Sequence, residues 1–396
     1  MDPVRNPFAP GAGSRPPELA GRDDLLETAR IAIERTRLGK STKSVVLVGL
    51  RGVGKTVLLD KIRERAEHDG VVTARIEAPE GRSLPSILAP QLRLVLLALS
   101  RFEKAKALST RALHGLAGFV GALKVKYGDI EVAVDLPVEK GLADNGDLEH
   151  DLQDLFEAVG LAAQADGKAV ALFIDELQYV KPEQLAALIT ACHRISQRQL
   201  PLIVIGAGLP QLRGLMGDSK SYSERLFEFP SIGPLPETAA RVALQKPCID
   251  EGAAMDDDAV NEIIIRTRGY PYFLQEWGSH SWNAAAKSPI SLADVRNASD
   301  IALAAMDESF FLVRFDRLTP LEKRYLRAMA EIGEGPHRSG DVAEELGRQV
   351  QSLGPTRSSL IRKGMIWSPN HGDTAFTVPL FDQFMKRIMP GDAWRG

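Results

Sequence analysis

The sequence predicts an α/β fold with a parallel sheet core, a helical region after it, and a small C-terminal unit of three helices and a hairpin. Up to about residue 205, near-continuous apolar runs of strand length alternate with segments of helical spacing, which is typical of a parallel sheet covered on both faces. After Pro236 the strand signals fade and helical spacing continues. Turn residues between two short β-like segments follow near the end of the chain.

Composition excludes several classes of protein. Of the 396 residues, 44% are hydrophobic and 26% are charged, which indicates a soluble globular chain with room for two or three domains. The two cysteines, Cys192 and Cys248, are too few for a disulfide framework and indicate a reducing cytoplasm. The first residues contain no apolar segment of a signal peptide, and the longest apolar runs are far below the roughly 20 residues of a membrane span. We therefore expect a cytoplasmic protein without a membrane partner.

The first 235 residues divide into a leader and a core. Residues 1–18 contain five prolines and little periodicity, so we expect a flexible leader. An insertion at 83–146 is helical and rich in leucine, and it includes a hairpin signal over 124–135. The core, residues 19–235, alternates expected helices at 23–38, 55–67, 147–164 and 183–197 with expected strands at 44–49, 71–77, 169–174 and 202–205.

A glycine-rich segment joins the first expected strand to the helix after it. The pattern G-x-x-x-x-G-K-[ST] is met there by Gly49-Leu50-Arg51-Gly52-Val53-Gly54-Lys55-Thr56. Its glycines let successive N–H groups point into one concavity that binds phosphate oxygens, and the next helix directs its N-terminus at the same anion. Lys55 would reach the β- and γ-phosphates, and the Thr56 hydroxyl would hold Mg²⁺. The alternative is a chance match on a glycine-rich turn.

An apolar strand that ends in two acids accompanies this phosphate loop. Residues 169–174 are followed by Asp175 and Glu176. Asp175 would hold the magnesium ion together with Thr56, and Glu176 would polarise the attacking water. Such a pair can also simply cap the next helix. Its place in the same α/β pattern as the phosphate loop favours the catalytic interpretation.

With both motifs in place, the chain resembles the AAA+/STAND group of P-loop ATPases, close to the initiator-like ATPases related to origin-recognition proteins, over about residues 19–387. The resemblance implies a P-loop NTPase core with ATP and Mg²⁺ as cofactors. It also implies nucleotide contacts from Gly49, Leu50, Arg51, Gly52, Val53, Gly54, Lys55, Thr56 and Val57. Arg22, in Leu19-Ala20-Gly21-Arg22-Asp23, is similar to the residue that borders the adenine, although this segment could equally be a helix N-terminus.

Three more segments are similar to motifs of this group. The strand at 202–205 resembles sensor 1 but lacks the usual polar residue at its end, which implies slow hydrolysis. Arg225 resembles an arginine finger, a group that spreads the negative charge of a transition state; a surface ion pair with Glu224 or Glu228 is the alternative. Pro271, after Gly269-Tyr270, resembles the lid proline that packs on adenine; a turn between two lid helices is equally compatible.

Residues 236–316 are expected to form the helical lid, and residues 317–396 a winged helix. In the second region, helices are expected at 321–332, 339–346 and 355–363, the last one starting at Gly354-Pro355, with β-like segments at 365–367 and 375–378. Three helices followed by a hairpin is the order of a winged helix-turn-helix.

The third of these helices has a basic face that could meet nucleic acid. From Arg317 to the end there are 12 basic and 9 acidic residues, although the whole chain has a net charge of −3. The candidate DNA contacts are Arg348, Arg357, Ser358, Arg362 and Lys363. Docking of a protein, packing within the chain, or a solvated face are the alternatives.

These features together predict an ATP-binding ATPase with slow, partner-stimulated hydrolysis. Its nucleotide state would control how the winged helix is presented to double-stranded DNA, and ATP, ADP and a second copy of the chain are further possible partners. The alternative is a STAND-like signalling switch or scaffold whose winged helix binds protein. Strong salt dependence of duplex binding would favour the first reading.

Overall fold

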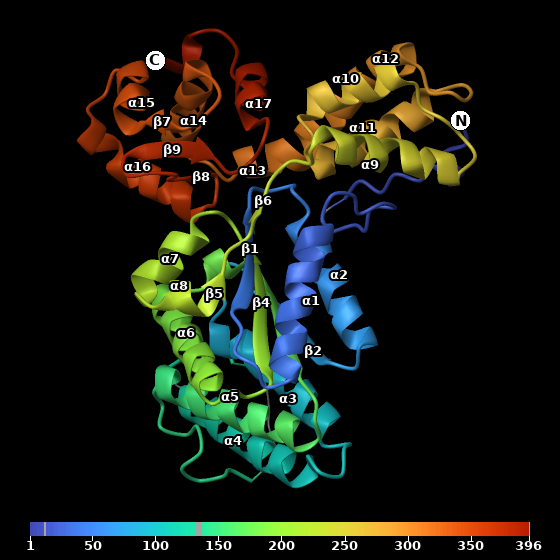
Figure 1. Ribbon diagram of the computed structural model, residues 1–396. Helices are drawn as coiled ribbons and strands as arrows, with labels where there is room; N and C mark the ends of the chain where they lie inside the picture. The colour runs from blue at the N-terminus through green and yellow to red at the C-terminus, as the bar shows by residue number, and fades with distance from the viewer. Residues whose placement is uncertain (12, 125, 131–136, 396) are drawn as a thin grey trace. The chain divides into compact units, whose positions relative to one another are not determined.

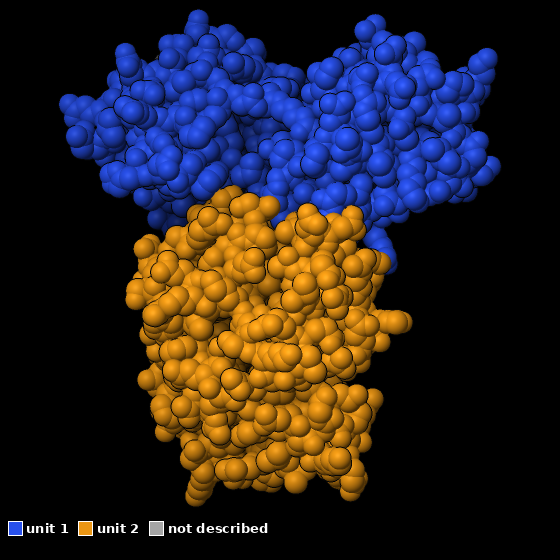
Figure 2. Space-filling view, in the orientation of Figure 1, with its two compact units in different colours: residues 1–22, 49–54, 232–396 blue, residues 23–48, 55–231 orange. Residues whose placement is uncertain are grey.

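Two compact units make up the chain in the computed structural model, which describes residues 1–11, 13–124, 126–130 and 137–395. Unit 1 comprises Met1–Arg22, Gly49–Gly54 and Ile232–Gly396, and unit 2 comprises Asp23–Val48 and Lys55–Ser231 (Figure 2). The division assigns the glycine-rich part of the phosphate loop to unit 1 and Lys55 to unit 2.

Unit 2 is built on a parallel sheet, as the alternating pattern predicts. The strand order is β2-β3-β4-β1-β5, and β6 (Ser231–Ile232) also pairs with β1. The other strands are β1 (Ser44–Gly49), β2 (Val72–Glu77), β3 (Val170–Asp175), β4 (Leu202–Gly208) and β5 (Phe227–Glu228). Every residue of β1, β3 and β4 is buried, because helices cover both faces of the sheet.

The helices of unit 2 divide between the two faces of this sheet. On one face lie α1 (Asp23–Arg37) and α2 (Lys55–His68), and on the other lie α5 (Leu148–Ala165) and α6 (Pro182–Gln197) (Figure 1). Within the insertion, α3 (Leu84–Leu99) and α4 (Lys106–Lys124) pack on α5 and extend its apolar core. The hairpin expected over 124–135 lies largely outside the described residues.

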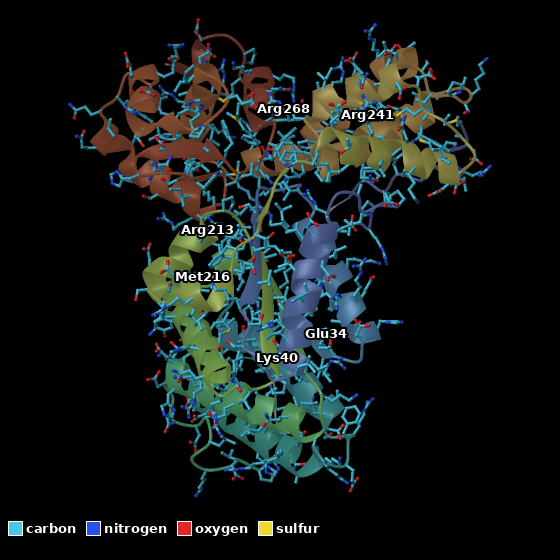
Figure 3. All side chains as sticks on the ribbon, in the orientation of Figure 1. Glu34, Lys40, Arg213, Met216, Arg241 and Arg268 are labelled. Carbon is cyan, nitrogen blue, oxygen red and sulfur yellow. The ribbon has the colours of Figure 1, made fainter. Side chains whose placement is uncertain are left out.

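The short elements of unit 2 flank the carboxyl and amino ends of the sheet. They are η2 (Leu177–Tyr179), α7 (Leu212–Ser219) and α8 (Ser223–Leu226). On α7, Arg213 donates a 2.8 Å hydrogen bond to the carbonyl of Phe229, and Met216 of the same helix is buried in the core (Figure 3). The chain between α8 and β6 is thereby fixed against α7.

Unit 1 contains a helical region and a C-terminal winged-helix-like region. The helical region consists of α9 (Glu237–Asp250), α10 (Asp257–Thr267), α11 (Pro271–Ala284), α12 (Leu292–Met306), a π-helical turn (Asp307–Leu312) and α13 (Val313–Phe315). The C-terminal region consists of α14 (Pro320–Ile332), β7 (His337–Arg338), α15 (Ser339–Glu345), α16 (Val350–Arg362), β8 (Ile366–Trp367), β9 (Asp373–Phe376) and α17 (Phe381–Ile388), with strand order β7-β9-β8. The predicted order of three helices and a hairpin is thus present.

One hydrophobic core joins the two regions of unit 1. It runs without a break from Leu244 and Trp277 of the helical region to Leu326 and Phe384 of the C-terminal region. The π-helical turn supplies Phe311, whose ring stacks on Phe384 at a centroid distance of 5.2 Å. The sequence predicts a boundary between the lid and the winged helix at residue 316, and apolar side chains from both sides of this boundary belong to the same core.

The N-terminal leader differs from the flexible segment that its prolines predict. Phe8 is 5% exposed and lies on Gly278 of α11, where a Cβ atom would come within 2.5 Å of the Phe8 ring. The indole of Trp282 donates a 2.9 Å hydrogen bond to the carbonyl of Asp2, and the Asn6 amide donates a 3.0 Å bond to the carbonyl of Ser279. The few apolar residues among these prolines show no periodicity, so only the packed structure reveals that Phe8 docks on α11.

The third helix of the C-terminal region begins earlier than Gly354-Pro355 predicts. Helix α16 starts at Val350, and Pro355 lies inside it. Proline at the first helical position is the usual signal, but Leu353 and Leu360 are both buried and lie on one face. Their burial keeps the first turn helical despite the proline. Among the described residues, no helix has both the length and the apolar character to cross a membrane.

Candidate functional site

The phosphate loop runs from the carboxyl end of β1 to the first residue of α2. Gly52 and Gly54 have φ values of +76° and +87°, the left-handed region that glycine enters without strain. A Cβ atom on Gly54 would meet nothing within 4 Å, so the loop is open at this residue. Among the described residues, the N–H groups of Gly52, Val53 and Gly54 have no hydrogen-bond acceptor. These are the groups that a phosphate would engage.

Three other segments of unit 1 hold the loop by hydrogen bonds. The Arg22 guanidinium donates to the carbonyl of Gly233 at 2.6 Å and to that of Val53 at 3.4 Å. Burial lowers the pKa of Arg22. The Tyr272 N–H, at the start of α11, donates to the carbonyl of Gly52 at 3.1 Å.

The third contact comes from the C-terminal region. The Arg51 N–H donates to the carbonyl of Thr377 at 3.0 Å, just beyond the end of β9. Thr377 is fully buried, and its own N–H donates to the carbonyl of Met365 at 3.0 Å. The sequence offers no signal for this contact, because nothing local distinguishes Thr377 from other threonines.

The predicted magnesium ligands of unit 2 lie against each other. The Thr56 hydroxyl donates a 2.6 Å hydrogen bond to one carboxylate oxygen of Asp175, and the Glu176 N–H donates a 2.8 Å bond to the other. Asp175 is 3% exposed, and burial raises its pKa, partly opposed by the bond from Thr56. Magnesium prefers oxygen ligands, and a buried carboxylate that is poorly solvated gains from a nearby cation. The Thr56 hydroxyl and the Asp175 carboxylate therefore fit Mg²⁺.

Lys55 opens α2 and is 7% exposed, although it is a lysine. Lysine is seldom fully buried unless it is paired. Its position at the N-terminus of α2 places a positive charge directly after the two left-handed glycines in the chain. The arrangement can bind the phosphates of a nucleotide.

Glu176 leaves β3 in an unusual backbone conformation. Its φ and ψ angles are 55° and 35°, the left-handed region, which is uncommon for a residue other than glycine. The Gln178 side-chain amide donates to the Glu176 carboxylate. Sequence analysis does not identify Gln178, although its position two residues after the acid pair was a possible signal.

The strand with the sensor-1 resemblance ends beside the acid pair. In the sheet register, Gly206 of β4 is opposite Ile174 of β3, and Gly208 is opposite Val48 of β1. The carboxyl ends of β1, β3 and β4 therefore meet at one edge of the sheet, where ligands of open α/β sheets bind.

Arg225 is not among the residues that meet at this edge. It is exposed on α8, just before Phe227, which is the register partner of Ser44 at the amino end of β1. The six residues of β1 span about 20 Å. Arg225 therefore lies at the strand end opposite to Lys55 and Asp175, and it cannot act on phosphates bound by its own copy.

Pro271 is the first residue of α11, after Tyr270 as N-cap. The residue that contacts the phosphate loop is its neighbour Tyr272. Arg268, two residues before Tyr270, has φ +51° and forms an ion pair with Glu334 of the C-terminal region (Figure 3 labels Arg268). The turn at the start of α11 is therefore tied both to the phosphate loop and to the C-terminal region.

The candidate DNA contacts fall into two groups. Arg348, Ser358 and Arg362 are exposed. Arg357 donates to the hydroxyls of Thr374 and Ser368 at 3.0 and 2.8 Å, and Lys363 donates to the Glu322 carboxylate at 2.7 Å. The last two cations stabilise the C-terminal region, so its outward basic face is smaller than the sequence predicts.

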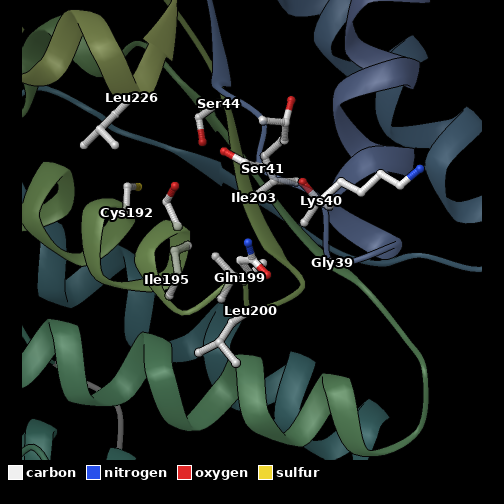
Figure 4. A pocket seen from close by; sticks show the side chains of 14 residues that line it. Gly39, Lys40, Ser41, Ser44, Cys192, Ile195, Gln199, Leu200, Ile203 and Leu226 are labelled. Atoms are coloured by element: carbon white, nitrogen blue, oxygen red, sulfur yellow. The ribbon is translucent and has the colours of Figure 1, made fainter.

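A small cavity lies at the opposite end of the sheet from the phosphate loop. Its volume is about 40 Å³, and it is lined by Lys40, Ser41, Ser44, Gln199 and Leu200 among others (Figure 4). Lys40, on the turn after α1, and Glu34, on α1 itself, are also marked in Figure 3. The cavity has room for about one water molecule and is too small for a nucleotide.

Comparisons with known proteins identify an ATPase domain by sequence and a similar fold by structure. The family described as the AAA ATPase domain matches residues 18–205, and a domain of unknown function matches residues 308–385. The fold is similar to that of a Walker-type ATPase of Pyrococcus abyssi, with a TM-score of 0.58, 16% identity, and coverage of 94% of this chain and 97% of that one.

Two other solved structures are similar at lower scores. They are the Thermotoga maritima RuvB Holliday junction branch migration motor (TM-score 0.45, 15% identity, 92% and 96% covered) and the Aeropyrum pernix Orc1 protein in complex with DNA (TM-score 0.45, 15% identity, 93% of each chain covered). No curated protein matches the chain in sequence.

Proposed function

This chain carries an AAA ATPase domain over residues 18–205 and is an ATPase, and we propose that its nucleotide state controls how its C-terminal region is presented to DNA. The hydrogen bond between the Arg51 N–H and the Thr377 carbonyl supports this most directly, because it joins the phosphate loop to the C-terminal region. A ligand shifts such an arrangement only through different affinities for its two states.

In the proposed site, the loop N–H groups and Lys55 bind the phosphates, and Thr56 and Asp175 hold Mg²⁺. Bound Mg²⁺ would neutralise charge on the phosphate oxygens. Glu176 accepts a proton from the attacking water, and Arg22 and Pro271 border the adenine. The carboxyl end of β4 carries glycine and alanine and supplies no polar side chain of its own, which supports slow hydrolysis that a partner stimulates. Exposed Arg225 would then act on a neighbouring copy.

The packing of unit 1 supports transmission from the loop to the C-terminal region. Tyr272, whose N–H binds Gly52, stacks on Phe310 of the π-helical turn at 4.7 Å. Phe310 contacts Phe311 edge-on at 5.2 Å, and Phe311 stacks on Phe384 of α17. We infer that α11 and the C-terminal region move together, because well-packed aromatic side chains transmit a shift rather than absorb it.

Nucleotide exchange should therefore change hydrogen exchange in the segment 364–378. A non-hydrolysable ATP analogue and ADP are expected to protect this segment to different degrees, because the Arg51 contact lies next to the phosphate-binding N–H groups. Mass spectrometry of the full chain measures the effect, and Lys55→Ala, at a nucleotide concentration that saturates only the wild type, is the control. Identical exchange with the analogue, with ADP and without nucleotide would contradict the switch.

The basic face of α16 should contact phosphates of duplex DNA. Arg362→Ala is expected to weaken binding and to reduce the slope of log affinity against log salt by about one unit, as for the loss of one phosphate contact. Arg296→Ala, an exposed arginine on α12, is the charge-matched control and should leave the slope unchanged. Fluorescence anisotropy over a salt series measures both.

A protein partner is the second candidate for this face. The internal bonds of Arg357 and Lys363 favour it, because they leave only Arg348 and Arg362 of the four basic residues exposed. Duplex binding that is absent at low salt, or equal in wild type and Arg362→Ala, would favour the protein-binding switch.

A further inference from the structure

The side chain of Gln178 connects Glu176, the proposed catalytic base, to the end of β4. We propose that Gln178 is a positioning residue that orients the Glu176 carboxylate for hydrolysis. The proposal rests on the proposed role of Glu176 and assigns the polar group that β4 itself lacks.

Glu176 needs an external support for its orientation. Its left-handed backbone conformation turns the chain sharply out of β3. Its N–H donates to the Asp175 carboxylate and its carbonyl accepts from the Tyr179 N–H, so these two bonds fix the backbone of Glu176 and not its side chain. The side chain is partly exposed, so its rotamer is not set by close packing. The amide of Gln178 binds one of its carboxylate oxygens.

Gln178 is itself fixed at its other end. Its amide oxygen accepts a 3.0 Å hydrogen bond from the Leu209 N–H, immediately after β4. A Cβ atom on Gly208 would lie 2.7 Å from that oxygen, so only glycine leaves room for it. A Cβ atom on Gly206 would likewise lie 2.4 Å from Leu177, the residue before Gln178. The two glycines of β4 thus accommodate the turn that carries Gln178.

Gln178 can position the Glu176 carboxylate without competing for the proton that this carboxylate accepts from water. A neutral amide donates one N–H to the carboxylate and has no basic site that competes for the proton of water. The hydrogen bond from the Gln178 side-chain amide uses one carboxylate oxygen of Glu176. The second oxygen can accept a hydrogen bond from a water molecule. Gln178 therefore acts by geometry, through Glu176, on the step that follows ATP binding.

Gln178→Glu is the sharpest test, because it keeps the shape and the acceptor for Leu209 but replaces the donor with a negative charge. We expect kcat to fall roughly 10- to 100-fold, as for misplacement of a catalytic group by about 1 Å, with ATP affinity within about twofold of wild type. Gln153→Glu makes the same change on α5, where Gln153 donates to the carbonyl of Glu149, and should leave kcat unchanged.

Gly208→Ala provides a second test that leaves Gln178 chemically intact. Its Cβ should displace the Gln178 amide, so kcat should fall while the far-ultraviolet circular dichroism and the ATP affinity stay close to wild type. Wild-type kcat in both Gln178→Glu and Gly208→Ala would overturn the proposal.

A double-mutant cycle separates this inference from the proposed function. In a Glu176→Gln background, Gln178→Glu should lower kcat no further, because the two residues act as a unit. Additive losses would show that Gln178 acts independently and would overturn the proposal. If Glu176→Gln alone keeps wild-type turnover, the catalytic role of Glu176 is wrong; if it loses turnover and Gln178→Glu does not, only the role of Gln178 is wrong.

Discussion

Glu176→Gln should lower ATP turnover by about a hundredfold or more while ATP binding stays near wild type. The amide has nearly the shape of the carboxylate but cannot accept a proton from water. The hydrogen bond from the Thr56 hydroxyl to Asp175 does not involve the Glu176 side chain, and Glu176 contacts Asp175 only through its backbone N–H. Steady-state phosphate release and the affinity for a fluorescent ATP analogue measure the two quantities separately.

Glu183→Gln is the matched control for this prediction. Glu183 is exposed in the first turn of α6, on the helix that follows the same loop. Its neutralisation changes the local charge by the same amount without reaching the acid pair. Wild-type turnover in Glu176→Gln, or an equal loss in Glu183→Gln, would remove Glu176 from the mechanism.

Lys55→Ala should weaken ATP binding by roughly 10- to 100-fold, the value of a hydrogen bond to a charged group, and with it lower turnover wherever ATP no longer saturates the variant. Lys55 is buried at the start of α2, so its ammonium group is little screened by water and would interact strongly with a bound phosphate. Calorimetric titration with ATP and magnesium measures the loss.

Lys61→Ala controls for the removal of a lysine from the same helix. Lys61 forms only a partly exposed ion pair with Glu64, at 3.9 Å, and should leave ATP affinity unchanged. The thermal midpoint of both variants shows whether each is folded. A folded Lys55→Ala variant with wild-type affinity would mean that the phosphate loop does not bind nucleotide.

The strands and helices of the core could be predicted from the sequence, because each of them has its own pattern of apolar residues. Every residue of β1, β3 and β4 is buried, so each strand appears as an apolar run, and each helix has its own apolar face. The phosphate loop and the acid pair have defined spacing and flanks, so the sequence alone predicts site roles for Lys55, Thr56, Asp175 and Glu176. The start of α16 predicted from Pro355 was wrong, because the burial of Leu353 keeps the preceding turn helical.

The connections between distant segments could not be read in the same way. Gln178 touches Leu209 and Arg51 touches Thr377, pairs that are far apart in the chain and involve backbone groups common to all residues. The sequence predicts that Lys363 is available to DNA, but in the structure its ammonium group donates a hydrogen bond to Glu322 of α14. Each of these contacts depends on how whole elements pack.

The sequence by itself therefore determined the parallel sheet and the winged-helix-like order, and it predicts the chemistry of the phosphate loop and acid pair, because periodicity and motif spacing act over a few residues. Only the tertiary structure decided that Phe8 docks on α11, that Arg225 lies at the far end of β1, and that Tyr272 and Thr377 hold the loop. Such contacts form when side chains and carbonyls from separate elements compete for the same buried space, and that competition is settled by packing of the whole unit.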